Sequence, residues 1–590
     1  MTSQSLIEKL TLIFSTAFEA CGLDPVFGRV IISDRPDLGQ FQCNGALAAA
    51  KAQKKNPRAL AQNVVDALRE KELFSQLSIA GPGFINITVA DTFLAAHVRE
   101  TAGDQRLGCE QISTPRNVII DFGGPNVAKP MHVGHLRSTI IGDSLQRLFR
   151  FMGDRVTGDI HLGDWGLQMG MLICELNRRR PSLPYFEASH AGPYPDESPV
   201  TIEELEEMYP TAAARCKTDE KEMEAARQAT AELQQGRTGY FALWRHFVAV
   251  SVKALKDDFE KLGVTFDLWR GESFYNDRLE SMIANLKTSG HAVLSDQALV
   301  IPVSRPADKK ELPPLILEKS DGGYLYGTTD LATIEERTKE LHADLILYVV
   351  DKRQHLHFEQ VFRAARLVSF AADAGLEHIA FGTMNGPDGK PFKTRAGGVM
   401  KLKDLISMVT ENALIRMHEN RIAEDYDAAE YRDIAHKVGI ATLKFADLNN
   451  HRTSDYVFDL ENFSKFEGRT GPYLLYTSVR IKSILRKARE TNLQPGSILP
   501  PAVPAERDLM LILSRLPDEV RNSYLDRAPN YLCDFAYTLA QTFSRFYQQC
   551  HILSEKDSAV QSSWLALSQL CLRELELLLF ILGIDLPERM

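Results

Sequence analysis

The chain has 590 residues, of which 44% are hydrophobic and 25% are charged. This balance is typical of a globular protein that buries a core of normal size, and the length predicts roughly three or four domains. The formal net charge of −10 excludes a protein that binds nucleic acid through overall positive charge. Local basic patches remain compatible with phosphate contacts.

Eight cysteines are scattered along the chain, with no CxxC pair and no His/Cys cluster. This spacing predicts reduced thiols, a cytoplasmic location and no zinc site. The first residues include Glu8 and lack a long apolar core, so they predict the start of a helix rather than a signal peptide. No apolar run reaches the length of a membrane span, and we expect no membrane partner.

Residues 1–110 predict a small α+β module at the N-terminus. Helical periodicity covers Ala59–Leu68, and the alternating segment Phe84–Val89 follows a Gly-Pro-Gly turn, as expected for a half-buried strand. A basic stretch nearby includes Lys54 and Lys55. It is either a solvated face of the module or a contact for a phosphate backbone.

A second domain is expected over residues 111–440. The run Val118–Ile120 predicts a buried strand, a glycine-containing loop follows, and a helix is predicted to begin near His132. Further strands are predicted at Leu345–Val350 and His378–Phe381. This succession is typical of a doubly wound parallel sheet of the Rossmann type, in which ligands bind at the carboxyl ends of the strands.

Two largely helical regions accompany the predicted sheet. The polar and acidic residues 181–240 predict a helical insertion between its halves. Residues 441–590 predict an all-helical bundle, because apolar side chains recur at helical spacing in 532–546 and again in 564–582. The predicted fold class is therefore multidomain α/β, with an N-terminal α+β module and a C-terminal all-α domain.

The most specific motif is the segment Pro125-Asn126-Val127-Ala128-Lys129-Pro130-Met131-His132-Val133-Gly134-His135. It lies where the predicted loop gives way to a helix, whose N-terminus offers unpaired N–H groups and a partial positive charge. Imidazoles at His132 and His135 could donate hydrogen bonds to a phosphate as charge builds in a transition state. Gly134 would let a flat base approach the backbone. A bare HxGH occurs by chance in many chains, so the strand–loop–helix context carries the interpretation.

This segment resembles the signature of class I aminoacyl-tRNA synthetases, and its flanks AKPMHVGHLRSTIIGD and HLGDWG resemble the arginyl enzymes of the bacterial type. The similarity continues through RGESFYND, YGTTDLA, YVVDKRQHLH, GKPFKTRAGG, FADLNNHRTSDY, FEGRTGPYLLY and the terminal ERM, and it spans nearly the whole chain. The resemblance implies a ligase of protein biosynthesis. Such an enzyme uses ATP with Mg²⁺ to join L-arginine to tRNA(Arg) through an arginyl-adenylate.

The resemblance also implies which residues bind ATP and act in catalysis. The segment Gly389-Lys390-Pro391-Phe392-Lys393-Thr394-Arg395 is similar to a degenerate KMSKS loop, whose cations would neutralise the departing pyrophosphate. A solvated basic turn is the alternative for this segment. The implied catalytic residues are His132, His135, Lys390, Lys393 and Arg395, and the implied ATP-binding residues are Pro125, Lys129, His132, Gly134, His135 and Lys393.

Amino-acid selection should depend on the charge of the pocket, because a guanidinium in a dry site requires carboxylates. Asp121 and Asp330 match positions at which the family holds its substrate. Without the resemblance, both would be interpreted as helix caps or ion-pair partners. Asn126, Tyr326 and Gln354 match further arginine-binding positions, with Asn126 and Gln354 at the amino and backbone end of the amino acid.

The resemblance further implies that residues 441–590 read the anticodon and that the N-terminal module contacts the tRNA. Tyr473 and Tyr476 stand near Arg480, and such rings either stack on flipped bases or pack between helices. Lys54 and Lys55 are the expected contacts in the module. A monomer is expected. Two alternatives stay open: a class I synthetase for another amino acid, such as lysine, and a non-catalytic relative that binds RNA.

Overall fold

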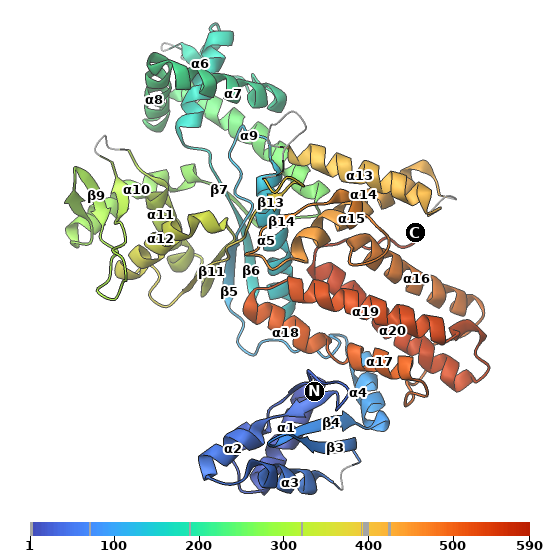
Figure 1. Cartoon of the computed structure of the whole chain (residues 1–590). Coiled ribbons are helices and arrows are strands. Elements are labelled where there is room, and N and C mark those ends of the chain that lie inside the picture. Colours follow the sequence, from blue (N-terminus) through green and yellow to red (C-terminus); the bar gives the residue numbers. More distant parts are fainter. Residues whose placement is uncertain are drawn as a thin grey trace. The chain divides into compact units, whose positions relative to one another are not determined.

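The structure is a computed structural model that describes residues 4–69, 72–187, 190, 192–319, 323–390, 392, 400–422 and 426–590. The chain divides into two compact units (Figure 1). One unit comprises residues 113–414 and 442–463, and the other comprises residues 1–112, 415–441 and 464–590.

The unit of residues 113–414 and 442–463 is built on a five-stranded parallel sheet. Its strands are β5 Asn117–Asp121, β6 Arg155–Leu162, β7 Leu268–Gly271, β11 Leu345–Tyr348 and β12 Gly375–His378, in the order β12-β11-β5-β6-β7. The central strand β5 is buried from Val118 to Asp121, as its apolar, β-branched sequence predicts. The chain continues from β5 to β6 on one side and returns to β11 on the other. This reversal places a ligand crevice at the carboxyl end of β5.

Helix α5, Val133–Met152, follows β5 and packs through the predicted apolar face. The side chains of Leu136, Ile140 and Leu145 are buried, and the helix ends at Gly153, whose φ of 105° lies in the left-handed region that favours glycine. Other helices of this unit are α10 Asn276–Thr288, α11 Tyr326–Lys339, α12 His355–Leu367 and α15 Leu460–Phe463, with the short helices η3 Glu272–Tyr275 and η4 Lys352–Gln354. Small sheets are formed by β8 Val293–Ser295, β9 Ala298–Ile301 and β10 Leu315–Glu318, and by β13 Met384–Asn385 with β14 Tyr456–Val457.

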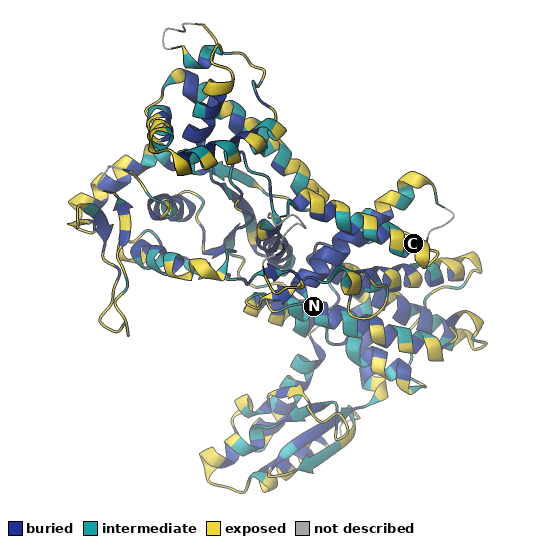
Figure 2. Ribbon diagram, turned by 45° about the horizontal axis from the view of Figure 1, so that its top comes forward, coloured by how far each residue is buried: buried dark blue, intermediate teal, exposed yellow. Residues whose placement is uncertain are grey.

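A helical region follows β6, in agreement with the helical character predicted for residues 181–240. It consists of α6 Leu167–Arg179, α7 Ile202–Thr218, α8 Glu220–Gln234 and α9 Thr238–Lys261. Buried positions alternate with exposed ones along these helices (Figure 2), as the amphipathic pattern requires. We call α6 to α9 the helical insertion.

The prediction of a strand at His378–Phe381 was wrong in its position. Strand β12 covers Gly375–His378 and pairs with β11 through residues such as Gly375 and Glu377. Glycine and glutamate are poor strand formers, so the hydrophobic pattern of the sequence did not indicate this edge strand. The chain stays beside β11 afterwards, because the N–H of Ile379 donates to the Tyr348 carbonyl at 2.8 Å.

The unit of residues 1–112, 415–441 and 464–590 combines an α+β module with a helical region. The module contains α1 Leu6–Ala20, β1 Val30–Ile32, β2 Phe41–Cys43, α2 Gly45–Gln53, α3 Pro57–Leu68, β3 Phe74–Ala80, β4 Phe84–Val89 and α4 Asp91–Gly103, with an antiparallel sheet in the order β1-β2-β4-β3. The predicted helix at Ala59–Leu68 and strand at Phe84–Val89 are both confirmed. The helical region contains α16 Gly471–Glu490, α17 Pro504–Leu513, α18 Leu516–Asp526, α19 Asn530–Gln549 and α20 Ser558–Ile581.

Helices α13 Leu402–Glu419 and α14 Ala428–Leu448 each contribute residues to both units. The predicted fold class, multidomain α/β with a C-terminal helical domain, is confirmed. In the described part of the chain, no helix is both long enough and apolar enough to cross a membrane.

A buried arginine holds the carboxyl end of the sheet together. Asp121 on β5 and Asp159 on β6 are register partners, so two carboxylates lie side by side. Arg337 of α11 is fully buried and donates through Nη2 to an oxygen of each aspartate, at 2.7 Å in both cases. Two adjacent carboxylates in a core repel each other unless a cation lies between them. Arg337 supplies that cation.

Replacing Arg337 with Met is expected to lower the free energy of unfolding by about 3–5 kcal/mol, because both aspartates then stay buried without a counter-charge. Urea denaturation followed by tryptophan fluorescence measures this, since Trp165, Trp244 and Trp269 lie in this unit. Lys339→Met on the same helix is the control. Its ion pair with Glu335 is exposed, so its removal should change the stability by about 1 kcal/mol or less. Equal effects of the two substitutions would contradict the role of Arg337.

Candidate active site

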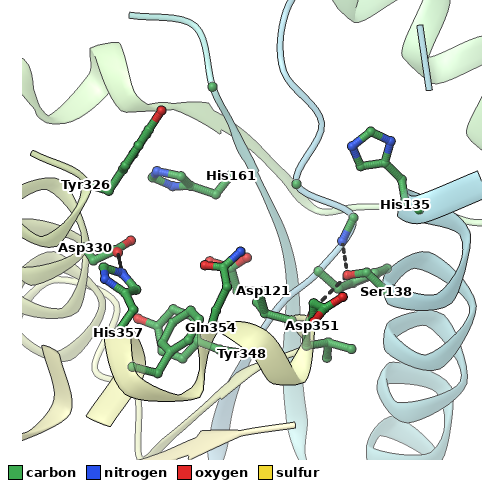
Figure 3. A pocket seen from close by; sticks show the side chains of 18 of the residues that line it. Asp121, His135, Ser138, His161, Tyr326, Asp330, Tyr348, Asp351, Gln354 and His357 are labelled. Atoms are coloured by element: carbon green, nitrogen blue, oxygen red, sulfur yellow. Dashed lines mark hydrogen bonds and ion pairs between the residues drawn. The ribbon is translucent and has the colours of Figure 1, made fainter. Parts of the chain in front are cut away.

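A pocket of about 500 Å³ opens at the carboxyl ends of β5, β6 and β11. Figure 3 shows its two walls: Tyr326, Asp330 and His357 lie on one side, and His135 and Ser138 lie on the other, with Gln354 between them. The pocket brings together most of the predicted catalytic, ATP-binding and arginine-binding residues from distant parts of the sequence. These are Asp121, Asn126, His132, Gly134, His135, Tyr326, Asp330 and Gln354.

The two histidines of the motif cap helix α5. Nδ1 of His132 accepts from the Gly134 N–H at 3.0 Å, and the His132 N–H donates to Nδ1 of His135 at 3.2 Å. The two rings stack with their centroids 4.0 Å apart. Because each Nδ1 accepts a hydrogen bond, the ring proton of each histidine is assigned to Nε2.

Both histidines are neutral at physiological pH. Burial and then the nearby Lys129 lower the pKa of His132, and burial together with His132 and Lys129 lowers the pKa of His135 to about 3. Each ring therefore offers one Nε2–H donor beside the positive end of a helix dipole. This arrangement can bind an anionic phosphate without carrying a full charge itself.

Gly134 is predicted to let a base approach the backbone, and the structure gives a second physical reason for a glycine at this position. A Cβ atom at this position would lie 2.7 Å from Cε1 of His132. Glycine therefore makes room for the capping histidine ring. Earlier in the same loop, Gly123 and Gly124 have φ values of 89° and 32°, which a residue with a side chain would adopt only under strain.

The acidic side of the pocket contains one carboxylate that has no partner among the residues that the structure describes. Asp121 uses Oδ2 to hold Arg337, and Asp330 accepts from Nε2 of His357 at 2.6 Å. Glu272, on η3, lines the same pocket, and no hydrogen bond or ion pair to its carboxylate is found among the described residues. Burial, with the nearby carboxylates of Asp164 and Asp330, raises the pKa of Glu272 to about 8. A bound cation would relieve this unfavourable environment.

Some predicted residues lie away from the pocket. Pro125 and Lys129 do not line it, and Nζ of Lys129 lies 4.4 Å from the centre of the Tyr209 ring. Lys390 is exposed in the turn after β13. The predicted residues Lys393 and Arg395 lie outside the described residues.

The predicted RNA contacts lie in the other unit. Lys54 and Lys55 are exposed at the end of α2, where Lys54 has a left-handed φ of 50°. On α16, Tyr476 is exposed, whereas Tyr473 is half-buried beside Tyr537. The guanidinium of Arg480, on the same helix, lies 4.5 Å from the ring centre of Tyr547.

Several residues of the pocket were not predicted from the sequence. Ser138 of α5 accepts from the Gly123 N–H at 2.8 Å and donates to the Val349 carbonyl at 2.6 Å, and so ties the loop after β5 to the end of β11. His161, Glu272 and Tyr348 also line the pocket. Glu272 stands in the motif RGESFYND, which carried the resemblance, but only the folded chain brings it beside Asp330.

Models of known protein families match three parts of the chain. The family model described as tRNA synthetases class I (R), catalytic domain, matches residues 97–460. The DALR anticodon binding domain matches residues 474–590, and the arginyl tRNA synthetase N terminal domain matches residues 6–89.

Relatives named arginine–tRNA ligase match over almost the entire chain. The protein of Alkaliphilus oremlandii is 51% identical and that of Maricaulis maris is 52% identical, each over 99% of this chain and 100% of the relative. The crystal structure of arginyl-tRNA synthetase from Plasmodium falciparum has a TM-score of 0.78 at 25% identity, with complete coverage of both chains. The Thermus thermophilus enzyme has the same TM-score at 22% identity, covering 99% of this chain and 100% of its own. The chain belongs to the arginyl-tRNA synthetases of class I.

Proposed function

We propose that this protein ligates L-arginine to tRNA(Arg) in two steps. Arginine and ATP with Mg²⁺ first give arginyl-adenylate and pyrophosphate, and the arginyl group then passes to the terminal ribose of the tRNA with release of AMP. The substrate carboxylate is already a nucleophile at neutral pH, so the protein needs no general base for the first step. Positioning and electrostatic stabilisation supply the catalysis.

The observation that carries this proposal is the carboxylate of Glu272 near Asp330, for which the described part of the chain offers no hydrogen bond or ion pair. A guanidinium presents donors in a planar fork that matches two carboxylates. Asp121, whose Oδ2 is engaged by Arg337, borders the same space and contributes negative charge to it. Asn126 and Gln354 would hold the amino and backbone end of arginine, and Tyr326, which is 71% exposed, would cover the bound amino acid.

The opposite wall would hold ATP. Nε2–H groups of His132 and His135 would donate to the α-phosphate, and the adenine would lie against the backbone at Gly134. Pro125 and Lys129 belong to the loop that leads into this helix, and Lys129 would leave the Tyr209 ring to reach a phosphate. Lys390, Lys393 and Arg395 would neutralise the pyrophosphate as it departs with its Mg²⁺.

The remaining parts of the chain would bind the tRNA. We propose three domains: residues 1–110 contact the tRNA through Lys54 and Lys55, residues 111–440 carry the chemistry, and residues 441–590 bind the anticodon through Tyr473, Tyr476 and Arg480. The side chains of Tyr476 and Arg480 are exposed, as contact with unstacked bases and their backbone requires, and Tyr473 is half-buried. The protein would act in the cytoplasm as a monomer, without zinc.

ATP–pyrophosphate exchange, measured for each amino acid with and without tRNA, tests the proposed function. Exchange should depend on arginine and should require tRNA(Arg), as the family resemblance implies. Exchange supported by lysine instead of arginine would show that the enzyme activates another amino acid and would contradict the proposal. A complete lack of exchange with every amino acid would favour the non-catalytic alternative.

Replacing His132 with Ala should lower the rate of arginine-dependent exchange by about 10²–10³, because a preorganised donor to the developing charge is lost. His291→Ala is the control, since His291 is exposed and does not line the pocket. An exchange rate for His132→Ala equal to that of the control would remove His132 from the catalytic step.

Arginine binding should strengthen by about tenfold or more as the pH rises from 6 to 8. Glu272 is mostly protonated below its pKa of about 8, and arginine binds its ionised form. His357 adds a smaller change of the same sign. Burial lowers its pKa, but the hydrogen bond to Asp330 and the negative charge of Asp330 together outweigh burial and raise it, so His357 loses its proton, and its claim on Asp330 weakens, as the pH rises.

Titration calorimetry of arginine with the wild-type protein and Glu272→Gln isolates the contribution of Glu272. The variant should bind arginine more weakly and lose most of the pH dependence. A variant with the same affinity and pH dependence as the wild type would show that Glu272 does not bind the substrate.

A further inference from the structure

The helical insertion contacts the loops of the pocket through α9. Figure 1 shows this helix running from the other helices of the insertion toward α5. Trp244 and Ser251 lie two turns apart on α9 and therefore on one face of it. Each of them makes a hydrogen bond to a loop that follows a strand of the central sheet.

The contact of Ser251 is made to a residue in a strained conformation. Ala128, in the loop between β5 and α5, has a φ of 61°, in the left-handed region that residues with a Cβ rarely adopt. Ala128 is buried, and its N–H donates to Oγ of Ser251 at 3.0 Å. Ser251 is itself buried and donates its hydroxyl proton to the Phe247 carbonyl at 2.7 Å. The hydroxyl is thus oriented to accept a hydrogen bond from the N–H of Ala128.

The same loop is tied to the loop after β6. The N–H of Val127 donates to the Gly163 carbonyl at 3.0 Å, and the indole N–H of Trp244 donates to the Asp164 carbonyl at 2.8 Å. The loops that carry Asn126 and Asp164 are therefore joined to each other, and α9 holds both.

A serine that bonds to the carbonyl four residues earlier is common in helices and often only satisfies its own hydroxyl. Ser251 differs because it also accepts a buried backbone N–H from another segment. Without it, that N–H would have no partner, and a left-handed alanine would lose the contact that favours it. Ala128 lies between Asn126, which borders the amino-acid end of the pocket, and His132, which caps α5. A change of its conformation would move both.

We infer that Ser251 is a positioning residue for the reaction. It holds Ala128 in the left-handed conformation and so fixes the position of Asn126 relative to His132, which caps α5. The helical insertion is thereby the support of the loop between β5 and α5. The inference rests on the proposed function for its kinetic consequence, but its structural consequence can be measured without any activity.

Hydrogen exchange at the Ala128 amide tests the structural consequence directly. In Ser251→Ala this amide should exchange about tenfold faster or more than in the wild type, because its acceptor is removed. Ser568→Ala is the matched control: Ser568 is also buried and donates to the carbonyl four residues earlier, but accepts no N–H from another segment among the described residues. Unchanged protection of Ala128 in Ser251→Ala would overturn the inference.

The kinetic arm compares ATP–pyrophosphate exchange by the same variants. Ser251→Ala should lose about tenfold in kcat/KM for ATP, whereas Ser568→Ala should not, even where the two lower the melting temperature equally. Adding Ala128→Gly to Ser251→Ala should recover part of the loss, since glycine adopts the left-handed conformation without strain.

A double variant no better than Ser251→Ala would contradict the strain argument. Full activity of Ser251→Ala alone would contradict the positioning role. Absence of exchange in the wild-type protein would refute the proposed function, whereas the hydrogen-exchange result would still decide the structural part of the inference.

Discussion

The ion pair of Arg337 with Asp121 and Asp159 is the constraint on which the pocket depends. Two aspartates side by side on adjacent buried strands would repel each other, and the shared guanidinium turns this repulsion into a link between α11, β5 and β6. Asp121 is also the last residue of β5, so the loop that leads to His132 starts from a fixed point. The chain thus carries an arginine of its own bound to Asp121, which lines the pocket that we propose receives arginine.

The acidic groups at the pocket are of two kinds, those paired with Arg337 and those that are not. Asp121 and Asp159 are compensated within the protein, whereas Glu272 has no partner among the described residues and is held in a pocket that raises its pKa. Across the pocket, His132 and His135 are neutral donors at a helix N-terminus. One wall therefore favours a cation and the other an anion. A substrate with a guanidinium at one end and a phosphate joined at the other would satisfy both walls, as an arginyl-adenylate does.

Local patterns predicted the part of the site that is continuous in sequence. Strand β5, its glycine loop and the start of α5 near His132 could be predicted, because hydrophobic periodicity and the flanking glycines are local signals. The predicted residues Asp121, Asn126, Asp330 and Gln354 were then located from motifs, and the fold brings them to one pocket.

Other features could not be predicted, because they depend on tertiary contacts. Nothing near Arg337 in the sequence shows that it lies between Asp121 and Asp159, and nothing near Ser251 shows that it accepts the Ala128 amide. Strand β12 was displaced in the prediction because pairing with β11, rather than side-chain pattern, determines where it begins.

A crystal structure with bound arginine tests the central claim most directly. The account predicts that the guanidinium of the ligand lies against Glu272 and Asp330, while Arg337 remains bound to Asp121 and Asp159. A ligand whose guanidinium displaces Arg337, or which places its α-amino group against Glu272, would contradict the account.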